Sequence, residues 1–356
     1  MTEKFERRTR SEKPDLVELG KNEGHQVSLN LTAAINGHVA ISGTSGVGKS
    51  VAGQKLLRNL VAEGGTAVAF DMHRLFANEN ILPELRDDLK VLGHEVDVYN
   101  EGIRLALFEP LQYVDGNRED TDDTVNALAT TIAGPLRLGC QQKADLIRAL
   151  SFVAREDIYE KRGIAALDEG LELVGSEVAA NVRDKLRHIL KRNVFRGGEN
   201  FLHRECVNIL RLSSFDLQTQ ELIAELVLAH LWRWAQAGHF VDHPVWLFCD
   251  ECQNLQFGGK GIVNQILQEG RKLGLNLILI TPKTDRKMLT AMGQAGTQLF
   301  FSPSHADVPM IAKMLNAGAW KDYVWQLRSL RRGQCFVLGA LEVDGNLIRH
   351  PLSLEI

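Results

Sequence analysis

Residues 43–50 read Gly43-Thr44-Ser45-Gly46-Val47-Gly48-Lys49-Ser50 and fit G-x-x-x-x-G-K-[ST], the pattern of a phosphate-binding P-loop. An apolar run at 38–41 predicts a buried strand before it, and helical spacing of apolar residues predicts a helix over 50–63. Glycines let backbone N–H groups approach phosphate oxygens, and a helix N-terminus attracts anions. We therefore expect Lys49 to reach the β- and γ-phosphates of a nucleotide and the Ser50 hydroxyl to hold Mg²⁺.

A second stretch, residues 244–251, is an apolar run that ends in two acids, Asp250 and Glu251. Such a run is common by itself and gains meaning because a P-loop precedes it. In that context it is a Walker B strand, in which Asp250 holds Mg²⁺ through water and Glu251 polarises the attacking water.

The order of strand, P-loop, helix and a further strand at 66–70 predicts a βαβ unit with parallel strands. Asp71 follows that second strand, at the carboxyl end where α/β sheets place their ligand chemistry. Two interpretations of Asp71 stay open here: it orients Mg²⁺ or water, or it caps the following turn.

The composition is that of a globular protein: 356 residues, 44% hydrophobic and 24% charged, with a net charge of −4. That charge argues against a basic outer surface but allows basic groups in a central pore. No apolar run approaches the ~20 residues of a membrane span, and the charged start lacks a signal-peptide core, so we expect a cytoplasmic protein. The odd, sparse set of five cysteines does not indicate a disulfide framework, and we interpret Cys249 and Cys252 as small apolar residues at a strand end.

The distribution of predicted elements indicates an α/β core interrupted by helices. We expect a charged arm at 1–24, the first half of the core at 25–116, an all-helical insert at 117–204 and the second half at 205–356. The insert carries a basic cluster that is either a contact surface for nucleic acid or a partner, or a solvated helix face: Arg183, Lys185, Arg187, His188, Lys191, Arg192 and Arg196.

Four segments together resemble the HerA/FtsK class of P-loop ATPases: the P-loop, 245–255, 268–277 and 330–335. The resemblance implies a RecA-like α/β fold with a mostly parallel sheet, ATP and Mg²⁺ as cofactors, and a homohexameric ring that moves duplex DNA. Members of the class work in DNA processing, transfer and anti-phage defence. The helical insert matches nothing in the class, so the chain is similar to a motor core with an insert.

The resemblance also implies an arginine finger. Arg271, in the stretch Glu-Gly-Arg-Lys, is the expected residue that reaches the γ-phosphate bound to a neighbouring subunit. Arg328, Arg331 and Arg332 are alternatives, and a solvated helix end is the bland interpretation of Arg271. One departure concerns the polar sensor, usually Gln, because this chain has Thr281 and Pro282 after the corresponding strand. Thr281 is the candidate replacement.

A translocating ring needs basic groups in its pore that contact the DNA backbone. The candidates are Lys260, Lys283, Arg286 and Lys287. The missing Gln and the negative net charge leave an alternative open, in which the protein is an ATP-dependent assembly or regulatory subunit that controls a partner nuclease or effector without moving DNA.

Overall fold

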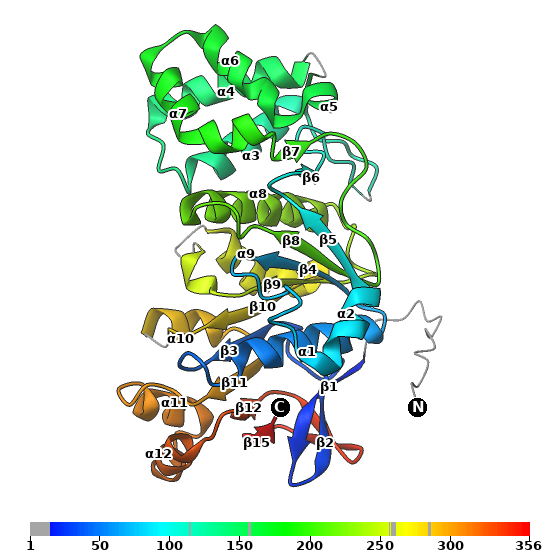
Figure 1. The fold of residues 1–356 in the computed structure, drawn as a ribbon, viewed down its shortest axis with the longest axis vertical. Coiled ribbons are helices and arrows are strands. Elements are labelled where there is room, and N and C mark those ends of the chain that lie inside the picture. The colour runs from blue at the N-terminus through cyan, green and yellow to red at the C-terminus, as the bar shows by residue number, and fades with distance from the viewer. Residues whose placement is uncertain (1–14, 114, 156–157, 256, 258–260, 284–285) are drawn as a thin grey trace.

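The computed structural model describes residues 15–356 except 114, 156–157, 256, 258–260 and 284–285. The molecule is elongated, with helices at one end, a large sheet in the middle and antiparallel strands with two helices at the other end (Figure 1). The first and last described strands, β1 (Leu16–Asn22) and β15 (Leu352–Glu355), lie in the half opposite the helical end.

The centre of the sheet is parallel and mostly buried. Its strands, in spatial order, are β11 (Thr297–Phe301), β3 (Val39–Ser42), β10 (Leu275–Thr281), β9 (Val245–Cys249), β4 (Thr66–Asp71), β8 (Val207–Arg211) and β5 (Gly93–Asp97). Every residue of β3, β9 and β10 is buried, which is typical of strands covered on both faces.

Successive residues of β10 pack into two different hydrophobic cores. Ile278 and Ile280 join a cluster that includes α1 (Lys49–Ala62), whereas Leu277 and Leu279 join a cluster that includes α8 (Leu217–Gln236) and α9 (Ile262–Glu269). The apolar runs of the sequence therefore reflect helices on both faces of one sheet.

The two strands of the predicted βαβ unit are parallel, as expected, but they are not neighbours in the sheet. Strands β3 and β4 are parallel, yet β10 and β9 lie between them in the sheet. The intervening strands come from more than 200 residues further along the chain, and local sequence patterns carry no signal for such a long-range insertion.

The sheet continues past β11 as an antiparallel extension. Its strands, in spatial order, are β12 (Gln334–Leu338), β15 (Leu352–Glu355), β1 (Leu16–Asn22), β2 (His25–Asn30), β13 (Leu341–Val343) and β14 (Asn346–Ile348). The expected arm at 1–24 was thus wrong for residues 16–22, where Val17 and Leu19 are buried at the alternate positions of a strand. Residues 1–14 lie outside the described residues.

Outside the insert, the remaining helices are α2 (Arg86–Leu92), α10 (Arg286–Met292), α11 (Val308–Leu315) and α12 (Trp320–Ser329), and α11 and α12 pack in a third hydrophobic cluster. Short 3-10 helices lie at Pro83–Leu85, Cys252–Asn254 and Gly270–Leu273, and another, Gly163–Ala165, lies in the insert. Among the helices that the structure describes, none combines the length and the apolar character needed to cross a membrane.

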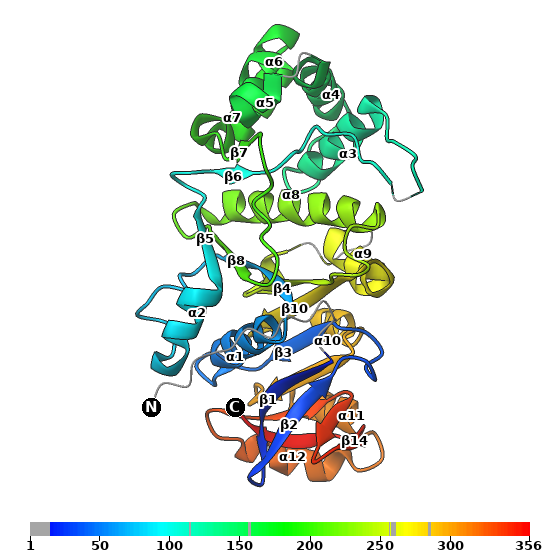
Figure 2. The ribbon, with the colours of Figure 1, turned by 90° about the vertical axis from the view of Figure 1, so that its right-hand side faces the viewer.

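The predicted helical insert is present and packs on α8 (Figure 2). Its helices are α3 (Thr121–Ala133), α4 (Cys140–Arg155), α5 (Ile158–Arg162), α6 (Ala166–Val174) and α7 (Glu177–Arg192). The chain enters through β6 (Ile103–Arg104) and leaves through β7 (Phe195–Arg196), and these two strands pair in parallel as a separate small sheet.

Much of the predicted basic cluster is engaged by other residues of the same chain. Arg183 forms two hydrogen bonds with the carboxylate of Asp168, and Arg192 donates to the hydroxyl of Tyr99. Lys185 donates to the carbonyl of Leu136. A contact surface on α7, if it forms, therefore relies on fewer cations than the sequence suggested.

A nearly buried ion pair links the insert to the core. Arg233 of α8 pairs with Glu119, just before α3, and their side chains are only 13% and 12% exposed. Glu119 also accepts hydrogen bonds from the backbone N–H of Leu111 and the hydroxyl of Thr124. The carboxylate therefore depends on Arg233 to offset its loss of water.

Replacing Arg233 with Met should lower the free energy of unfolding by about 3 kcal/mol, because it leaves the Glu119 charge buried without its cation. The matched control is Arg162→Met, which breaks the exposed Arg162–Glu169 pair and should cost less than about 1 kcal/mol. Urea unfolding followed by circular dichroism measures both, and equal losses would contradict the role of the buried pair.

Candidate functional site

The phosphate loop joins β3 to α1 and takes a shape that its glycines permit. Gly43, Gly46 and Gly48 all have positive φ angles, of 148°, 81° and 113°. A Cβ atom on Gly43 would lie 2.7 Å from the Cβ of Phe301, so no larger residue fits there without a shift. The loop conformation therefore requires glycine at the positions that the motif specifies.

Neighbouring segments hold this loop in place from outside. The backbone N–H and the hydroxyl of Thr44 both donate to the carbonyl of Ser302, at 2.9 and 3.0 Å. The N–H of Gly333 donates to the carbonyl of Val47 at 2.9 Å. Ser302 follows β11 and Gly333 precedes β12, so the edge of the parallel sheet braces the loop.

Lys49 lies beneath the loop, between it and the acidic pair. Its side chain is buried, and its Nζ donates to the carbonyl of Thr44 at 2.7 Å. Burial lowers the pKa of Lys49, while the nearby charges of Glu251 and Asp250 act in the opposite direction. The ammonium is thus held where it can bridge bound phosphates and the carboxylates. Ser50 follows it in the first turn of α1.

The acidic pair follows β9 directly. Burial, and then repulsion from Glu251, raises the pKa of Asp250 to about 6, with smaller opposing effects from His73 and Lys49. Two close carboxylates in a buried position gain stability from a divalent cation. Together with the Ser50 hydroxyl they offer the hard oxygen donors that Mg²⁺ prefers, so these residues fit the metal and the nucleotide that the P-loop implies.

Strand register explains why these distant residues meet. β10 pairs with β3 so that Thr281 lies opposite Ser42, and with β9 so that Leu279 lies opposite Cys249. The carboxyl ends of β3, β10 and β9 are therefore adjacent, and the P-loop and the acidic pair share one edge of the sheet.

The structure favours the capping interpretation of Asp71. Its carboxylate accepts hydrogen bonds from the backbone N–H of Leu75 at 2.7 Å and of Phe76 at 3.4 Å. Burial raises the pKa of Asp71, and these bonds oppose that shift. Asp71 is thus committed to the turn after β4.

Arg271 lies far from the P-loop of its own chain. It occupies the 3-10 helix before β10, whereas the acidic pair and Thr281 mark the opposite end of the strands. Seven residues of β10 span about 20 Å at a rise of ~3.3 Å per residue. Arg271 is exposed and lines a cavity of about 310 Å³ with Trp246 and Asn276, so it could act only on another copy's nucleotide.

The alternative arginines occupy different positions. Arg331 and Arg332 immediately precede Gly333, which bonds to Val47, so their turn lies beside the phosphate loop of their own chain. Arg328 of α12 lies over the ring of Trp325, with its Cζ 6.0 Å from the ring centre. Arg271 therefore lies at the edge of the sheet opposite the P-loop, whereas Arg331 and Arg332 lie beside the P-loop of their own chain.

The candidate pore residues are described only in part. Lys283 and Arg286 are exposed, close to the carboxyl end of β10. Lys260 lies outside the described residues, as does the side chain of Lys287.

The cysteine pair beside the acids is structural. Cys249 and Cys252 are both fully buried, and burial raises the pKa of each thiol. In the part of the chain that the structure describes, no group of three or more His, Cys, Asp or Glu residues forms a metal-binding cluster.

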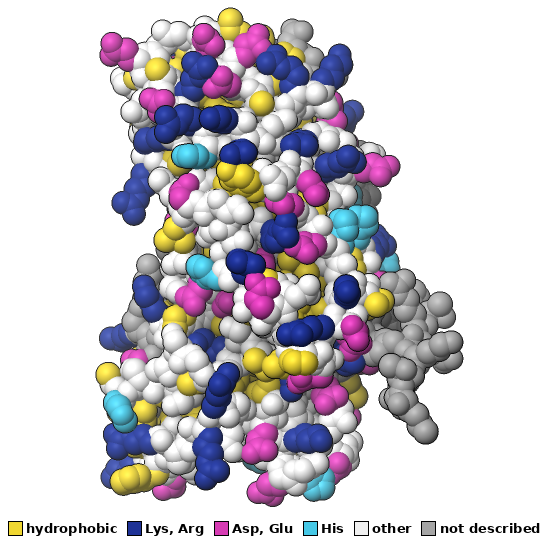
Figure 3. All heavy atoms as spheres, in the orientation of Figure 1, with side chains coloured by type: hydrophobic (Ala, Val, Ile, Leu, Met, Phe, Trp, Pro, Cys, Tyr) yellow, Lys and Arg dark blue, Asp and Glu magenta, His cyan; other side chains and the backbone are white. Residues whose placement is uncertain are grey.

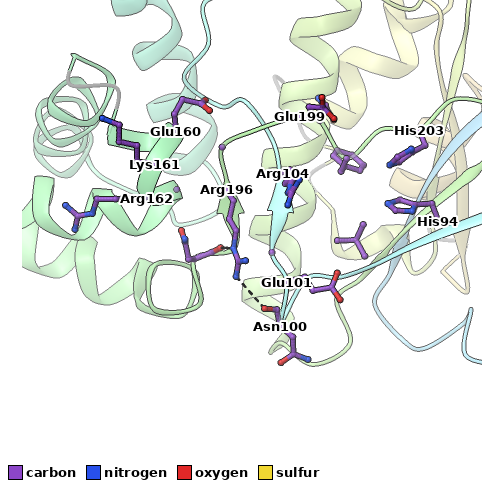
Figure 4. A pocket seen from close by; sticks show the side chains of 17 residues that line it. His94, Asn100, Glu101, Arg104, Glu160, Lys161, Arg162, Arg196, Glu199 and His203 are labelled. Atoms are coloured by element: carbon purple, nitrogen blue, oxygen red, sulfur yellow. Dashed lines mark hydrogen bonds between the residues drawn. The ribbon is translucent and has the colours of Figure 1, made fainter.

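A second cavity, of about 720 Å³, lies between the core and the insert and is shown in Figure 4. Its lining mixes cations and anions, such as Arg104, Arg196, Glu101 and Glu160, and includes the rings of His94 and His203, whose centres are 4.1 Å apart and whose planes are tilted by 53°. Neither the P-loop residues 43–50 nor the acidic pair Asp250 and Glu251 lines this cavity. On the face drawn in Figure 3, basic and acidic side chains are likewise interspersed among the described residues.

Comparison with known proteins agrees with this site. The family model "Helicase HerA, central domain" matches residues 16–231. Among solved structures, VirB4 of Thermoanaerobacter pseudethanolicus aligns with a TM-score of 0.65 at 17% identity, covering 96% of each chain. The bacterial conjugative coupling protein TrwB aligns with a TM-score of 0.59 at 13% identity, covering 95% of this chain and 89% of that one. A search of curated proteins found no match.

The family model spans more than half of the chain, so this protein belongs to the HerA family of P-loop ATPases. The likeness to VirB4 and TrwB confirms the RecA-like α/β fold expected from the sequence.

Mutations in the P-loop and in the acidic pair should have different effects, the first on ATP binding and the second on hydrolysis. Lys49→Ala should weaken ATP binding roughly a hundredfold, because it removes a charged hydrogen bond to the phosphates. Glu251→Gln should keep ATP affinity but lower kcat about a thousandfold, because it removes the group that activates water. Fluorescent-nucleotide binding and phosphate release measure the two effects, with Lys55→Ala on the same helix as the control. Wild-type turnover in Glu251→Gln would overturn the assignment.

Proposed function

We propose that this protein is a Mg²⁺-dependent ATP hydrolase that assembles as a homohexameric ring and moves along duplex DNA, in DNA processing, transfer or anti-phage defence. The observation that carries the proposal is the meeting of the P-loop and the acidic pair at one sheet edge, in a member of the HerA family. The solved TrwB structures give further support, since TrwB is a plasmid coupling protein captured with ADP and Mg²⁺.

Within one subunit, the residues divide the chemistry between them. The loop N–H groups and Lys49 bind the phosphates, and Ser50 and Asp250 hold the metal, Asp250 through water. The metal supplies positive charge that offsets the charge of the phosphates. Glu251 accepts a hydrogen bond from the attacking water and orients it toward the γ-phosphate.

We propose that a cation from a neighbouring subunit completes the site, and that Arg271 supplies it. Its exposure and its position at the far edge of the sheet suit a contact with the nucleotide of a neighbour. Such a finger neutralises charge in the transition state and makes hydrolysis depend on assembly.

A mixing experiment tests the finger and the ring together. Lys49→Ala and Arg271→Ala proteins should each be nearly inactive, yet mixed assemblies should regain ATPase activity, because the intact Arg271 of one subunit completes the intact P-loop of the other. The control mixture is Lys49→Ala with Glu251→Gln, whose lesions fall in the same site and should not complement. Hexamers that form in native mass spectrometry without recovery in the first mixture would contradict a finger at Arg271.

Lys283 and Arg286 are the proposed DNA contacts, together with Lys260 and Lys287. Contacts of this kind read the phosphate backbone and not the base sequence. They also release counterions on binding, so they make DNA affinity sensitive to salt.

Duplex DNA should therefore stimulate ATP hydrolysis, and the protein should displace a block bound to the duplex while it hydrolyses ATP. Affinity should fall about tenfold for a fourfold rise in salt for every two phosphates that the ring contacts. Lys283→Gln combined with Arg286→Gln should weaken this salt dependence and the stimulation, whereas Lys21→Gln combined with Arg349→Gln provides an exposed control pair. A flat salt response would argue against these contacts.

The second candidate function is an ATP-dependent assembly or regulatory subunit that controls a partner nuclease or effector. The absence of a Gln directly after β10 and the net charge of −4 favour it. That function predicts ring formation that responds to ATP, with no stimulation by duplex DNA and no displacement of a block. The same assays therefore decide between the two functions.

A further inference from the structure

A chain of hydrogen bonds joins the acid of the Walker B strand to the segment that follows β10. The amide Nε2 of Gln253 donates to the carboxylate Oε2 of Glu251. The hydroxyl of Thr281 donates to Oε1 of Gln253 at 2.8 Å, and the backbone N–H of Lys283 donates to that hydroxyl at 3.0 Å. Three contacts thus connect Glu251 with Lys283.

The chemistry of these groups fixes the direction of the chain. A backbone N–H only donates, so the Thr281 oxygen accepts from Lys283 and its single hydrogen is free to donate onward. The amide of Gln253 accepts at its oxygen and donates at its nitrogen, and an ionised carboxylate only accepts. Turning the Gln253 amide around would set its carbonyl oxygen against the Glu251 carboxylate, and that contact would be lost.

The local structure places each member of this chain. Gln253 lies in the 3-10 helix Cys252–Asn254, which begins directly after Glu251, and Glu251 itself has a left-handed φ of 52°. Thr281 is the last residue of β10 and is fully buried, opposite Ser42 at the start of the phosphate loop. Pro282 has no N–H, so the first backbone donor after Thr281 is Lys283.

We propose that Gln253 is a positioning residue, which holds the Glu251 carboxylate for water activation and links it through Thr281 to the backbone of Lys283, a proposed DNA contact. The inference rests on the proposed ATP hydrolysis and gives it a coupling path. Gln253 takes the place of the polar residue that the family resemblance led us to expect directly after β10.

The arrangement accounts for two properties of the site. Gln253 occupies one oxygen of the carboxylate and leaves the other to accept from water, so it limits the rotation of an otherwise flexible side chain. A displacement of the Lys283 backbone is transmitted to Glu251, because the single hydroxyl of Thr281 hydrogen-bonds both to the Lys283 N–H and to the Gln253 amide. The relay touches no residue of the phosphate loop through its hydrogen bonds, so its loss should change turnover more than nucleotide affinity.

Two substitutions at Thr281 isolate the hydroxyl from the shape of the side chain. Thr281→Val keeps the shape and removes the hydroxyl, and should lower kcat about tenfold to a hundredfold with little change in the KM for ATP or in nucleotide affinity. Thr281→Ser keeps the hydroxyl and should retain near wild-type kcat. Thr131→Val, in α3 of the insert, is the control, because its hydroxyl bonds only to a carbonyl of its own helix.

A double-mutant comparison tests whether Gln253 and Thr281 act as a unit. Gln253→Met should lower kcat to a similar extent. The double variant Gln253→Met with Thr281→Val should have a kcat no lower than that of the less active single variant. Wild-type kcat in Thr281→Val, losses that multiply in the double variant, or a loss confined to nucleotide affinity would each overturn the proposal.

ATPase assays with and without duplex DNA test the role of Gln253 and the proposed translocation separately. If DNA stimulates the wild-type ATPase, the fold-stimulation should fall toward one in Thr281→Val, and unchanged stimulation would overturn the link to Lys283. If DNA does not stimulate the wild-type enzyme, translocation fails, and the kcat measurements without DNA still decide whether Gln253 positions Glu251.

Discussion

β10 lies between β3 and β9, and its parallel hydrogen bonds to both strands determine which residues share the edge of the sheet. The P-loop grows from the end of β3 and the acidic pair from the end of β9. A slip of one residue in either pairing would exchange the two faces of β10 and move Ile278 and Ile280 away from α1. The same pairing therefore builds the core and aligns the catalytic groups.

Electrostatics at this edge is balanced among a few buried charges. Lys49 and Asp250 each lose water on folding, and the attraction between their charges offsets part of that cost. The carboxylates outnumber the lysine, which leaves room for a divalent cation and, with it, the negative charge of a nucleotide. The charges of the site therefore suit a divalent cation bound together with a negatively charged nucleotide.

The sequence was most informative where function depends on local chemistry. Glycine positions define the phosphate loop, and apolar runs identify the buried strands, so the P-loop, Walker B strand and helical insert were predictable. Strand order was not, because β10 pairs with β3 and β9 pairs with β4, and more than 170 positions separate the paired residues in each case. The engagement of Arg183 by Asp168 and the relay through Gln253 were missed for a similar reason, since both depend on side chains that meet only after folding.

The insert is attached through two short strands, β6 and β7, that pair side by side. The two points where the chain leaves and rejoins the core are therefore neighbours in space, although about 90 residues separate them in sequence. A segment of quite different length could close between the same two points without changing the register of the central sheet, provided that it offered α8 an apolar surface. The ATPase core can therefore accommodate different inserted domains at the point where β6 and β7 pair.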